Sequence, residues 1–150
     1  MDDIDCKILA ELQKDGRLTV TELSEHIGLS VSSCQRRLRA LEQAKVISGY
    51  RAIIDPAAVG LNFAAIVFAT LRHMTTQDVA SFEDALQNIP EITCAERLFG
   101  DPDYMLHVVT QDLSTFQTLY DRSLLALPCL LRLTSTIVMK SICRDRSLPL

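Results

Sequence analysis

The sequence of 150 residues contains no tryptophan, only five glycines and five prolines, and no apolar run long enough to cross a membrane. A transmembrane helix needs about 20 consecutive apolar residues. The N-terminus carries aspartates where a secretory signal would carry basic residues. The chain also has no glycine-rich phosphate loop, Gly-x-Ser-x-Gly motif or Cys-x-x-Cys pair. We therefore expect a cytoplasmic protein with no membrane partner, no cofactor and no metal site.

The five cysteines are odd in number and widely spaced along the chain. They are expected to be reduced thiols of a cytosolic protein, mostly in its core, rather than a disulfide framework. A histidine and a cysteine could in principle form a nucleophile–base pair, but no other feature of a catalytic site accompanies them. The sequence therefore favours a protein that binds its partners over an enzyme.

Residues 19–51 carry the most informative pattern, which predicts two short helices, a turn and an extended segment. Thr19 and Glu22 form a capping box that begins the first helix, and Gly28 can end it in the left-handed conformation. Ser30 then caps a second helix. This spacing is typical of a helix-turn-helix, whose second helix enters the DNA major groove.

Positive charge is concentrated on that second helix and just after it. Residues 1–29 carry three Lys/Arg against seven Asp/Glu, a net of −4, whereas residues 30–51 carry five against Glu42 alone, a net of +4. A chain of overall charge −4 thus places its cations where phosphates would be met. Arg37, nearer the core side, is expected either to reach a phosphate or to pair with an acidic neighbour. The predicted DNA contacts are Ser30, Ser32, Ser33, Gln35, Arg36, Arg37, Arg39 and Arg51.

Two flanking segments complete this first domain. A helix over about residues 3–15 supplies the third helix that closes a small core. After Lys45 the run to Pro56 looks extended, and we interpret it as a wing or linker strand that ends at a domain boundary near Pro56. For residues 19–51, the alternative to a helix-turn-helix is a helical hairpin whose arginines are solvated.

The remaining residues alternate strand and helix patterns in the order β-α-β-β-α-β, which is that of a ferredoxin-like fold. The fold class is therefore α+β, with a winged helix-turn-helix domain at 1–56 and a ferredoxin-like domain at 57–150. Apolar residues occupy both faces of the first strand, while two helices can cover only one, so the other face is expected to meet a partner subunit. The expected elements are Phe63–Leu71, Val79–Ile89, Ile92–Phe99, Tyr104–Thr110, Leu113–Leu127 and Leu133–Ile142.

Several short motifs occur in a fixed order along nearly the whole chain. They are Asp3-Ile4-Asp5, Leu12 to Arg17, Glu22-Leu23-Ser24, Ile27-Gly28-Leu29-Ser30, Cys34-x-x-Arg37-Leu38-x-x-Leu41-Glu42, Ile47-x-Gly49-Tyr50, Asp55-Pro56 and Gly100-Asp101-Pro102-Asp103-Tyr104. In this order they resemble the Lrp/AsnC family of prokaryotic transcription regulators. The resemblance implies dimers built through the C-terminal domains, often assembled into octamers. It also implies a small-molecule effector, usually an amino acid, bound between subunits near the Gly100–Tyr104 turn.

The turn has the groups that such an effector needs. A zwitterion requires acceptors for its ammonium and donors for its carboxylate, and Asp101 and Asp103 are acceptors while Gly100 allows close backbone approach. An ordinary turn, with aspartates bonding their own backbone, is the alternative. The predicted effector-binding residues are Leu98, Phe99, Gly100, Asp101, Asp103, Tyr104, Thr134, Ser135 and Thr136.

Together these patterns predict a sequence-specific DNA-binding transcriptional regulator of amino-acid metabolism, a homo-oligomer whose effector modulates assembly and DNA binding. The second hypothesis is a stand-alone amino-acid-binding oligomer without specific DNA binding. Salt-dependent DNA retention separates the two, because only the regulator neutralises phosphates.

Overall fold

The computed structural model describes residues 1–143 and 146–150, and the chain folds into two compact units. The first unit comprises Met1–Ile53 together with Ile142–Leu150, and the second comprises Ile54–Ser141. The passage between them lies close to the boundary expected at Pro56. The C-terminal segment Ile142–Leu150, which the sequence places in the domain at 57–150, makes its contacts with the first unit. The domain limits 1–56 and 57–150 stay a prediction.

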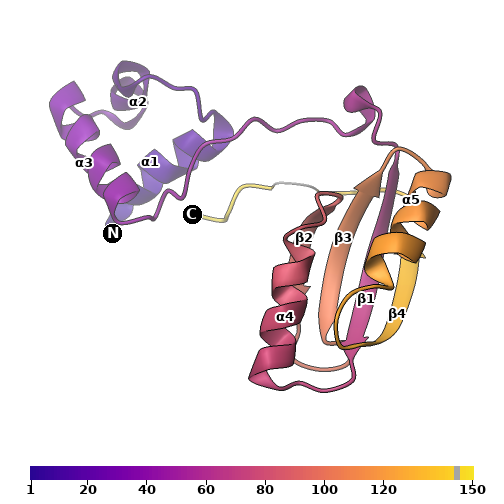
Figure 1. Ribbon diagram of the computed structural model, residues 1–150. Coiled ribbons are helices and arrows are strands. Elements are labelled where there is room, and N and C mark those ends of the chain that lie inside the picture. The colour runs from indigo at the N-terminus through magenta and orange to yellow at the C-terminus, as the bar shows by residue number, and fades with distance from the viewer. Residues whose placement is uncertain (144–145) are drawn as a thin grey trace. The chain divides into compact units, whose positions relative to one another are not determined.

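The first unit contains α1 (Asp3–Lys14), α2 (Val20–Ile27) and α3 (Val31–Gln43) (Figure 1). Each helix begins where a polar side chain accepts backbone N–H groups of its first turn, and these caps are Asp2, Thr19 and Ser30. The three helices enclose a small apolar core formed by Ile8, Leu9, Leu23, Cys34 and Leu41.

The segment after α3 does not form the predicted wing strand. Between α3 and the short 3₁₀ helix η1 (Ala57–Val59), the described residues contain no strand. Lys45 adopts a left-handed conformation, and the N–H groups of Val46 and Ile47 both donate to the Leu41 carbonyl. These two N–H groups are used at the C-terminal end of α3, so they are not available for the hydrogen bonds of a strand ladder. The expected strand pairing therefore does not begin here.

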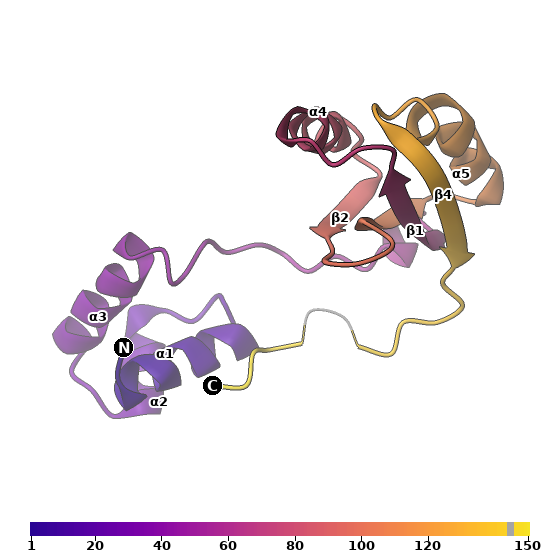
Figure 2. The same ribbon diagram turned by 90° about the horizontal axis from the view of Figure 1, so that it is seen from below.

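The second unit is a four-stranded antiparallel sheet with two helices packed on one face, as Figures 1 and 2 show. The strand order is β2-β3-β1-β4, and the ferredoxin-like arrangement predicted from the sequence is confirmed. The elements in chain order are β1 (Phe63–Leu71), α4 (Thr76–Leu86), β2 (Ile92–Arg97), β3 (Tyr104–Thr110), α5 (Leu113–Leu119), a π-helical turn η2 (Tyr120–Leu124) and β4 (Leu130–Ile137).

The limits predicted for the last strand are wrong by several residues. β4 pairs antiparallel with β1 from Leu130 opposite Leu71 to Ile137 opposite Ala65. β4 runs toward the N-terminal end of β1, which is Phe63, so the ladder stops there. Its last hydrogen bond is from the Val138 N–H to the Ala64 carbonyl. The β-branched pattern continues beyond Ile137, but β1 has no further residues with which that part of the chain can pair.

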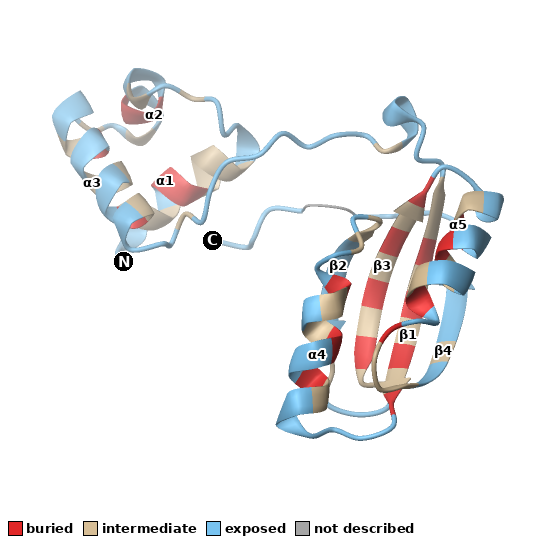
Figure 3. Ribbon diagram, viewed as in Figure 1, coloured by how far each residue is buried: buried red, intermediate tan, exposed pale blue. Residues whose placement is uncertain are grey.

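Alternate residues of the sheet face in opposite directions, and Figure 3 shows the resulting stripes of burial. One set packs beneath α4 and α5 and includes Val67, Leu106 and Val108, all buried. The other set lies on the face that no helix of the described chain covers. It is half-buried and largely apolar, and comprises Ala64, Ile66 and Phe68 of β1 with Met105, His107 and Val109 of β3.

All five cysteines are free thiols. Only Cys34 is buried, whereas Cys94 and Cys143 are exposed, so the prediction that the cysteines lie mostly in the core is wrong for these two. Burial raises the pKa of the Cys34 thiol, which therefore stays protonated as a core group.

Candidate functional site

The turn between α2 and α3 orients the second helix of the motif. Gly28 ends α2 with a φ of 71°, a left-handed conformation that favours glycine, and the next N–H, of Leu29, donates to the Ser24 carbonyl. The Ser30 hydroxyl then accepts the Ser33 N–H at 3.3 Å and lies 3.3 Å from the Ser32 hydroxyl. Ser30, a predicted DNA contact, therefore already has a structural role as the cap of α3.

The outer face of α3 is polar and cationic. Ser32, Gln35, Arg36 and Arg39 are exposed, opposite the buried Cys34. Within the described part of the chain, neither Arg36 nor Arg39 has an ion pair or hydrogen bond. Two cations with no internal partner on one helix face are free to meet an anionic ligand. Arg51, another predicted DNA contact, lies exposed in the segment after α3.

Arg37, also a predicted DNA contact, is instead held inside the unit. Its Nη1 donates to both carboxylate oxygens of Asp2, at 2.9 and 3.1 Å, and to Asp5 Oδ1 at 2.8 Å. Its Nε is buried without a partner among the described residues. The Asp5 and Asp2 carboxylates raise the pKa of Arg37, while the Asp5 N–H and then Arg37 lower that of Asp2. Of the two roles open from the sequence, the acidic pairing is the one observed.

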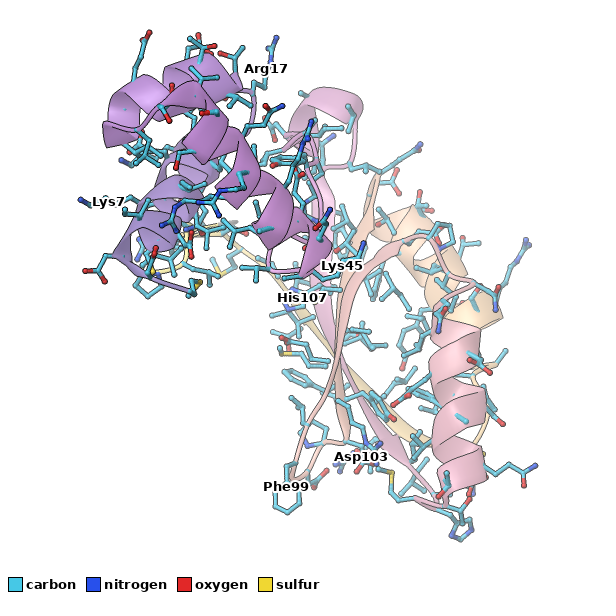
Figure 4. The ribbon with its side chains drawn as sticks, turned by 90° about the vertical axis from the view of Figure 1, so that its left-hand side faces the viewer. Lys7, Arg17, Lys45, Phe99, Asp103 and His107 are labelled. Atoms are coloured by element: carbon cyan, nitrogen blue, oxygen red, sulfur yellow. The ribbon has the colours of Figure 1, made fainter. Side chains whose placement is uncertain are left out.

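In the second unit, the turn between β2 and β3 is fastened to the end of β1. The Leu98 N–H donates to the Asp103 carbonyl at 2.7 Å, and the Asp103 N–H donates to the Ala69 carbonyl at 3.1 Å. The Asp103 carboxylate also accepts the Leu71 N–H at 2.8 Å. Figure 4 shows Phe99 at the tip of this turn, pointing away from the sheet, and Asp103 at its base.

A cavity of about 590 Å³ lies beside this turn and includes both predicted aspartates. Arg132 of β4 reaches Asp101, with 3.2 Å between Nη2 and Oδ1, and the Thr70 hydroxyl lies 3.3 Å from the same oxygen. Sequence reasoning missed Arg132, because only the register that sets it opposite Thr70 reveals its position. The lining residues are Thr70, Leu71, Met74, Asp101, Asp103, Leu131 and Arg132.

Two residues predicted to bind the effector lie on the helix-covered side of the sheet. Tyr104 is only 1% exposed, and its hydroxyl donates to Glu83 at 2.9 Å. Burial, reinforced by the Glu83 carboxylate, raises the pKa of Tyr104 to about 12. Ser135 pairs with Val67 and lines a separate cavity of about 330 Å³ beneath α5.

The neighbouring threonines face the other way. Thr134 pairs with Phe68 and Thr136 with Ile66, which places both on the uncovered face. The sequence predicts one hydroxyl-rich strand segment, but strand alternation divides it between two faces.

Two kinds of site are absent from the described residues. They contain no group of three or more histidine, cysteine or acidic side chains placed to hold a metal ion. None of their helices is both long enough and apolar enough to span a bilayer.

Comparison with known protein families accounts for both units. An AsnC-type helix-turn-helix domain matches residues 1–42, and an Lrp/AsnC ligand binding domain matches residues 64–148. The Bkd operon transcriptional regulator of Pseudomonas aeruginosa is 33% identical over 150 residues, covering 100% of this chain and 98% of the relative. The leucine-responsive regulatory protein of Escherichia coli is 35% identical over 142 residues, with coverages of 95% and 87%.

Solved structures agree. A transcriptional regulator from Neisseria meningitidis, crystallised as an L-Met complex, superposes with a TM-score of 0.93 at 34% identity, covering 99% of this chain and 96% of the other. An AsnC family regulator from Agrobacterium tumefaciens gives a TM-score of 0.93 at 30% identity, with coverages of 99% and 97%. The chain therefore belongs to the Lrp/AsnC family of DNA-binding transcriptional regulators.

Proposed function

We propose that this protein regulates genes of amino-acid metabolism by placing α3 in the DNA major groove, under the control of an amino acid bound by the second unit. One observation carries the DNA half of the proposal. The exposed face of α3 presents Arg36 and Arg39, which have no partner among residues 1–143 and 146–150, and this face begins near the capped end that a helix-turn-helix directs at base edges. Ser32, Ser33 and Gln35 lie nearest that end and are proposed to assist.

The oligomeric half of the proposal rests on the uncovered sheet face. Ile66, Phe68, Met105 and Val109 form an apolar surface that is only half-buried within one chain. A second copy packed against this face would remove it from water. A two-fold dimer presents two α3 helices, so we propose roughly palindromic DNA sites and further assembly, up to an octamer.

The effector half is supported by the cavity beside the β2–β3 turn and by the Neisseria neighbour, whose structure holds L-Met. We propose that an amino acid binds at this turn, between subunits. The proposed contacts are Leu98, Phe99, Gly100, Asp101 and Asp103 of the turn with Thr134 and Thr136 of β4. DNA as the proposed partner and the five free thiols both favour a cytoplasmic location.

The test is salt-dependent DNA binding, measured by fluorescence anisotropy on duplexes that the wild-type protein selects from a random library. We expect the DNA affinity to fall steeply between about 50 and 200 mM salt, as it does for a protein that neutralises several phosphates. Arg39→Ala should reduce the affinity and the salt slope. Lys7→Ala removes an exposed cation from α1 and serves as the matched control.

Amino-acid binding without DNA retention at any salt would replace this proposal with the stand-alone sensor. Affinity and selectivity unchanged in Arg36→Ala and Arg39→Ala would show that α3 is not the helix that reads DNA.

A further inference from the structure

We propose that Lys45 binds a DNA phosphate at the C-terminal end of α3, and that this contact explains a lysine at a position whose backbone conformation favours glycine. The inference rests on the DNA-binding function proposed above and adds a residue that is not among the predicted DNA contacts. It is supported by the backbone conformation of Lys45, by the surroundings of its side chain and by its place along α3.

Lys45 has a left-handed backbone conformation, with a φ of 57°. Its N–H donates to the Glu42 carbonyl at 3.1 Å, and the Val46 N–H donates to the Leu41 carbonyl at 3.0 Å, so this conformation closes the end of α3. In the left-handed region a Cβ atom crowds the following carbonyl oxygen, which strains every residue that has a side chain. The helix end therefore requires the conformation at position 45, but it does not require a lysine.

Two other helices of the described chain end in the same conformation, and both use glycine there. Gly28 ends α2 with a φ of 71°, and Gly60 ends η1 with a φ of 82°. Glycine adopts this region without the clash of a Cβ atom. The end of α3 thus carries a strain that the ends of α2 and η1 avoid.

Cys129 is the other non-glycine residue of the described chain with a positive φ, 59°. Contacts hold it in place: its thiol donates to Asp78 at 3.0 Å, and its carbonyl accepts the Arg72 N–H at 2.8 Å. The Lys45 side chain is exposed, and its ammonium has no ion pair or hydrogen bond among residues 1–143 and 146–150. No contact within those residues accounts for the lysine, so we look for its partner outside the chain.

The place of Lys45 at the end of α3 suits a phosphate (Figure 4). α3 has 13 residues. At about 1.5 Å per residue it is roughly 20 Å long, whereas the major groove is only about 12 Å wide. A helix whose N-terminal residues reach base edges therefore brings its C-terminal end to the sugar–phosphate backbone.

The charges around Lys45 leave its ammonium available to that phosphate. Glu42 is the only acidic residue among positions 30–51, and its carboxylate accepts the Tyr50 hydroxyl at 3.1 Å. A structural role is the alternative, because a cation at a helix C-terminus also interacts favourably with the helix dipole. Such a role would affect the stability of the first unit and leave the salt dependence of DNA binding unchanged.

The experiment separates the charge of the side chain from the conformation of the backbone, using the full chain. Lys45→Arg keeps the charge, Lys45→Gln keeps a side chain without the charge, and Lys45→Gly removes the charge and relieves the strain. Lys7→Gln removes another exposed lysine, on α1, and serves as the matched control. Fluorescence anisotropy over a salt series gives the affinity for a selected duplex and for an unrelated one, and thermal melts give the stability.

DNA affinity should follow the charge. Lys45→Gln and Lys45→Gly should bind equally weakly, and each should reduce the slope of log affinity against log salt by about 0.9 for every subunit on the DNA. The loss should be the same on both duplexes, because a phosphate contact carries no sequence information. Lys45→Arg and Lys7→Gln should bind as the wild type does.

Stability should follow the backbone instead. Lys45→Gly should melt at a higher temperature than Lys45→Gln, because both lack the charge and only glycine relieves the left-handed residue. Weaker DNA binding in the more stable of the two variants cannot come from damage to the fold.

The proposal is overturned by a wild-type salt slope in Lys45→Gln and Lys45→Gly, or by a loss confined to the selected duplex. If Arg39→Ala weakens DNA binding while the Lys45 variants do not, the Lys45 contact fails and the proposed function stands. If the wild type retains no DNA at any salt, both fail together.

Discussion

Two exposed surfaces, the outer face of α3 in the first unit and the β2–β3 turn with β4 in the second, treat their arginines in opposite ways. On α3, Arg36 and Arg39 stand without a partner in the described chain, whereas Arg132 of the second unit is matched by Asp101. DNA is a polyanion, and binding it releases counterions only if the protein brings unbalanced positive charge. An amino acid carries both charges, and a site for it is best left neutral when empty. The balance of charge at each of these two sites follows the charge of the ligand proposed for it.

The units also differ in what stabilises them. The second has a large core between sheet and helices, while the first has a small one and relies on polar links between helices. Arg37 joins α3 to the start of α1, and His26 Nδ1 lies 2.9 Å from Glu11 of α1. A unit that buries little apolar area gains relatively more from caps and ion pairs.

The largest effect is expected from Phe82→Ala in the core of the second unit. Phe82 is fully buried, and its ring centroid lies 4.7 Å from that of Tyr104. The truncation should cost about 3–5 kcal/mol of unfolding free energy. Urea denaturation should show the second unit unfolding earlier while the helices of the first persist. Phe99→Ala, the same change at a fully exposed site, should leave the midpoint nearly unchanged. Equal losses would show that Phe82 is not a core anchor.

A smaller effect is expected on DNA binding from Arg36→Ala, about 1–3 kcal/mol with relaxed preference at one base position. Arg37→Gln should behave differently, because it leaves Asp2 and Asp5 without their cation and lowers the melting temperature of the first unit. Anisotropy on selected duplexes and thermal melts of both variants separate the two effects. An identical profile for the two variants would contradict the contrast between a free and an internal arginine.

The third test uses pH. Because the pKa of Tyr104 is raised from its ordinary value of 10 to about 12, its neutral form stabilises the fold fully below pH 10. That contribution is lost as pH rises through 12. Tyr104→Phe should cost about 0.5–1.5 kcal/mol at pH 7, through the lost hydrogen bond to Glu83. Denaturation of both proteins between pH 7 and 12 should show this difference shrinking above pH 10. A constant difference would mean that the phenol titrates normally.

The smallest effect is expected from Gln13→Ala on α1. The Gln13 side-chain amide donates to the Leu148 carbonyl at 3.3 Å and accepts the Leu148 N–H at 2.6 Å. Both bonds are exposed, so their loss should cost less than about 1 kcal/mol. Hydrogen exchange of the Leu148 amide should accelerate in the variant. Gln43→Ala, at the exposed end of α3, provides the control and should leave that amide protected.

Much of the fold could be predicted because its signals are local. The caps at Thr19 and Ser30 and the glycine at position 28 act on their own helix, and β1 and β3 have the limits that their apolar pattern predicts. Features that depend on distant partners could not be predicted. For Arg37 the sequence left two roles open, and it did not identify the partner Asp2, which lies 35 positions away.

The candidate effector site shows the same limit. Its turn was visible as Gly100–Tyr104, but the faces of β4 depend on the register with β1. A strand predicted to start at Leu133 leaves Arg132 outside the sheet and gives no reason to divide Thr134 from Ser135. The observed pairing of Arg132 with Thr70 supplies both.

The return of Ile142–Leu150 to the first unit has a topological consequence. The second unit is inserted within the first rather than appended to it, and its two ends are each continued by a segment of the same host unit. Inserted domains of this kind can be exchanged as cassettes when their ends are close together. Cleavage of the single segment between α3 and β1 would break the covalent link between Met1–Ile53 and the rest of the chain. The contacts of Ile142–Leu150 would still hold the two parts of the first unit together. A shortened chain in which Ile53 is linked to Ile142 would retain the helix-turn-helix together with the segment that contacts Gln13.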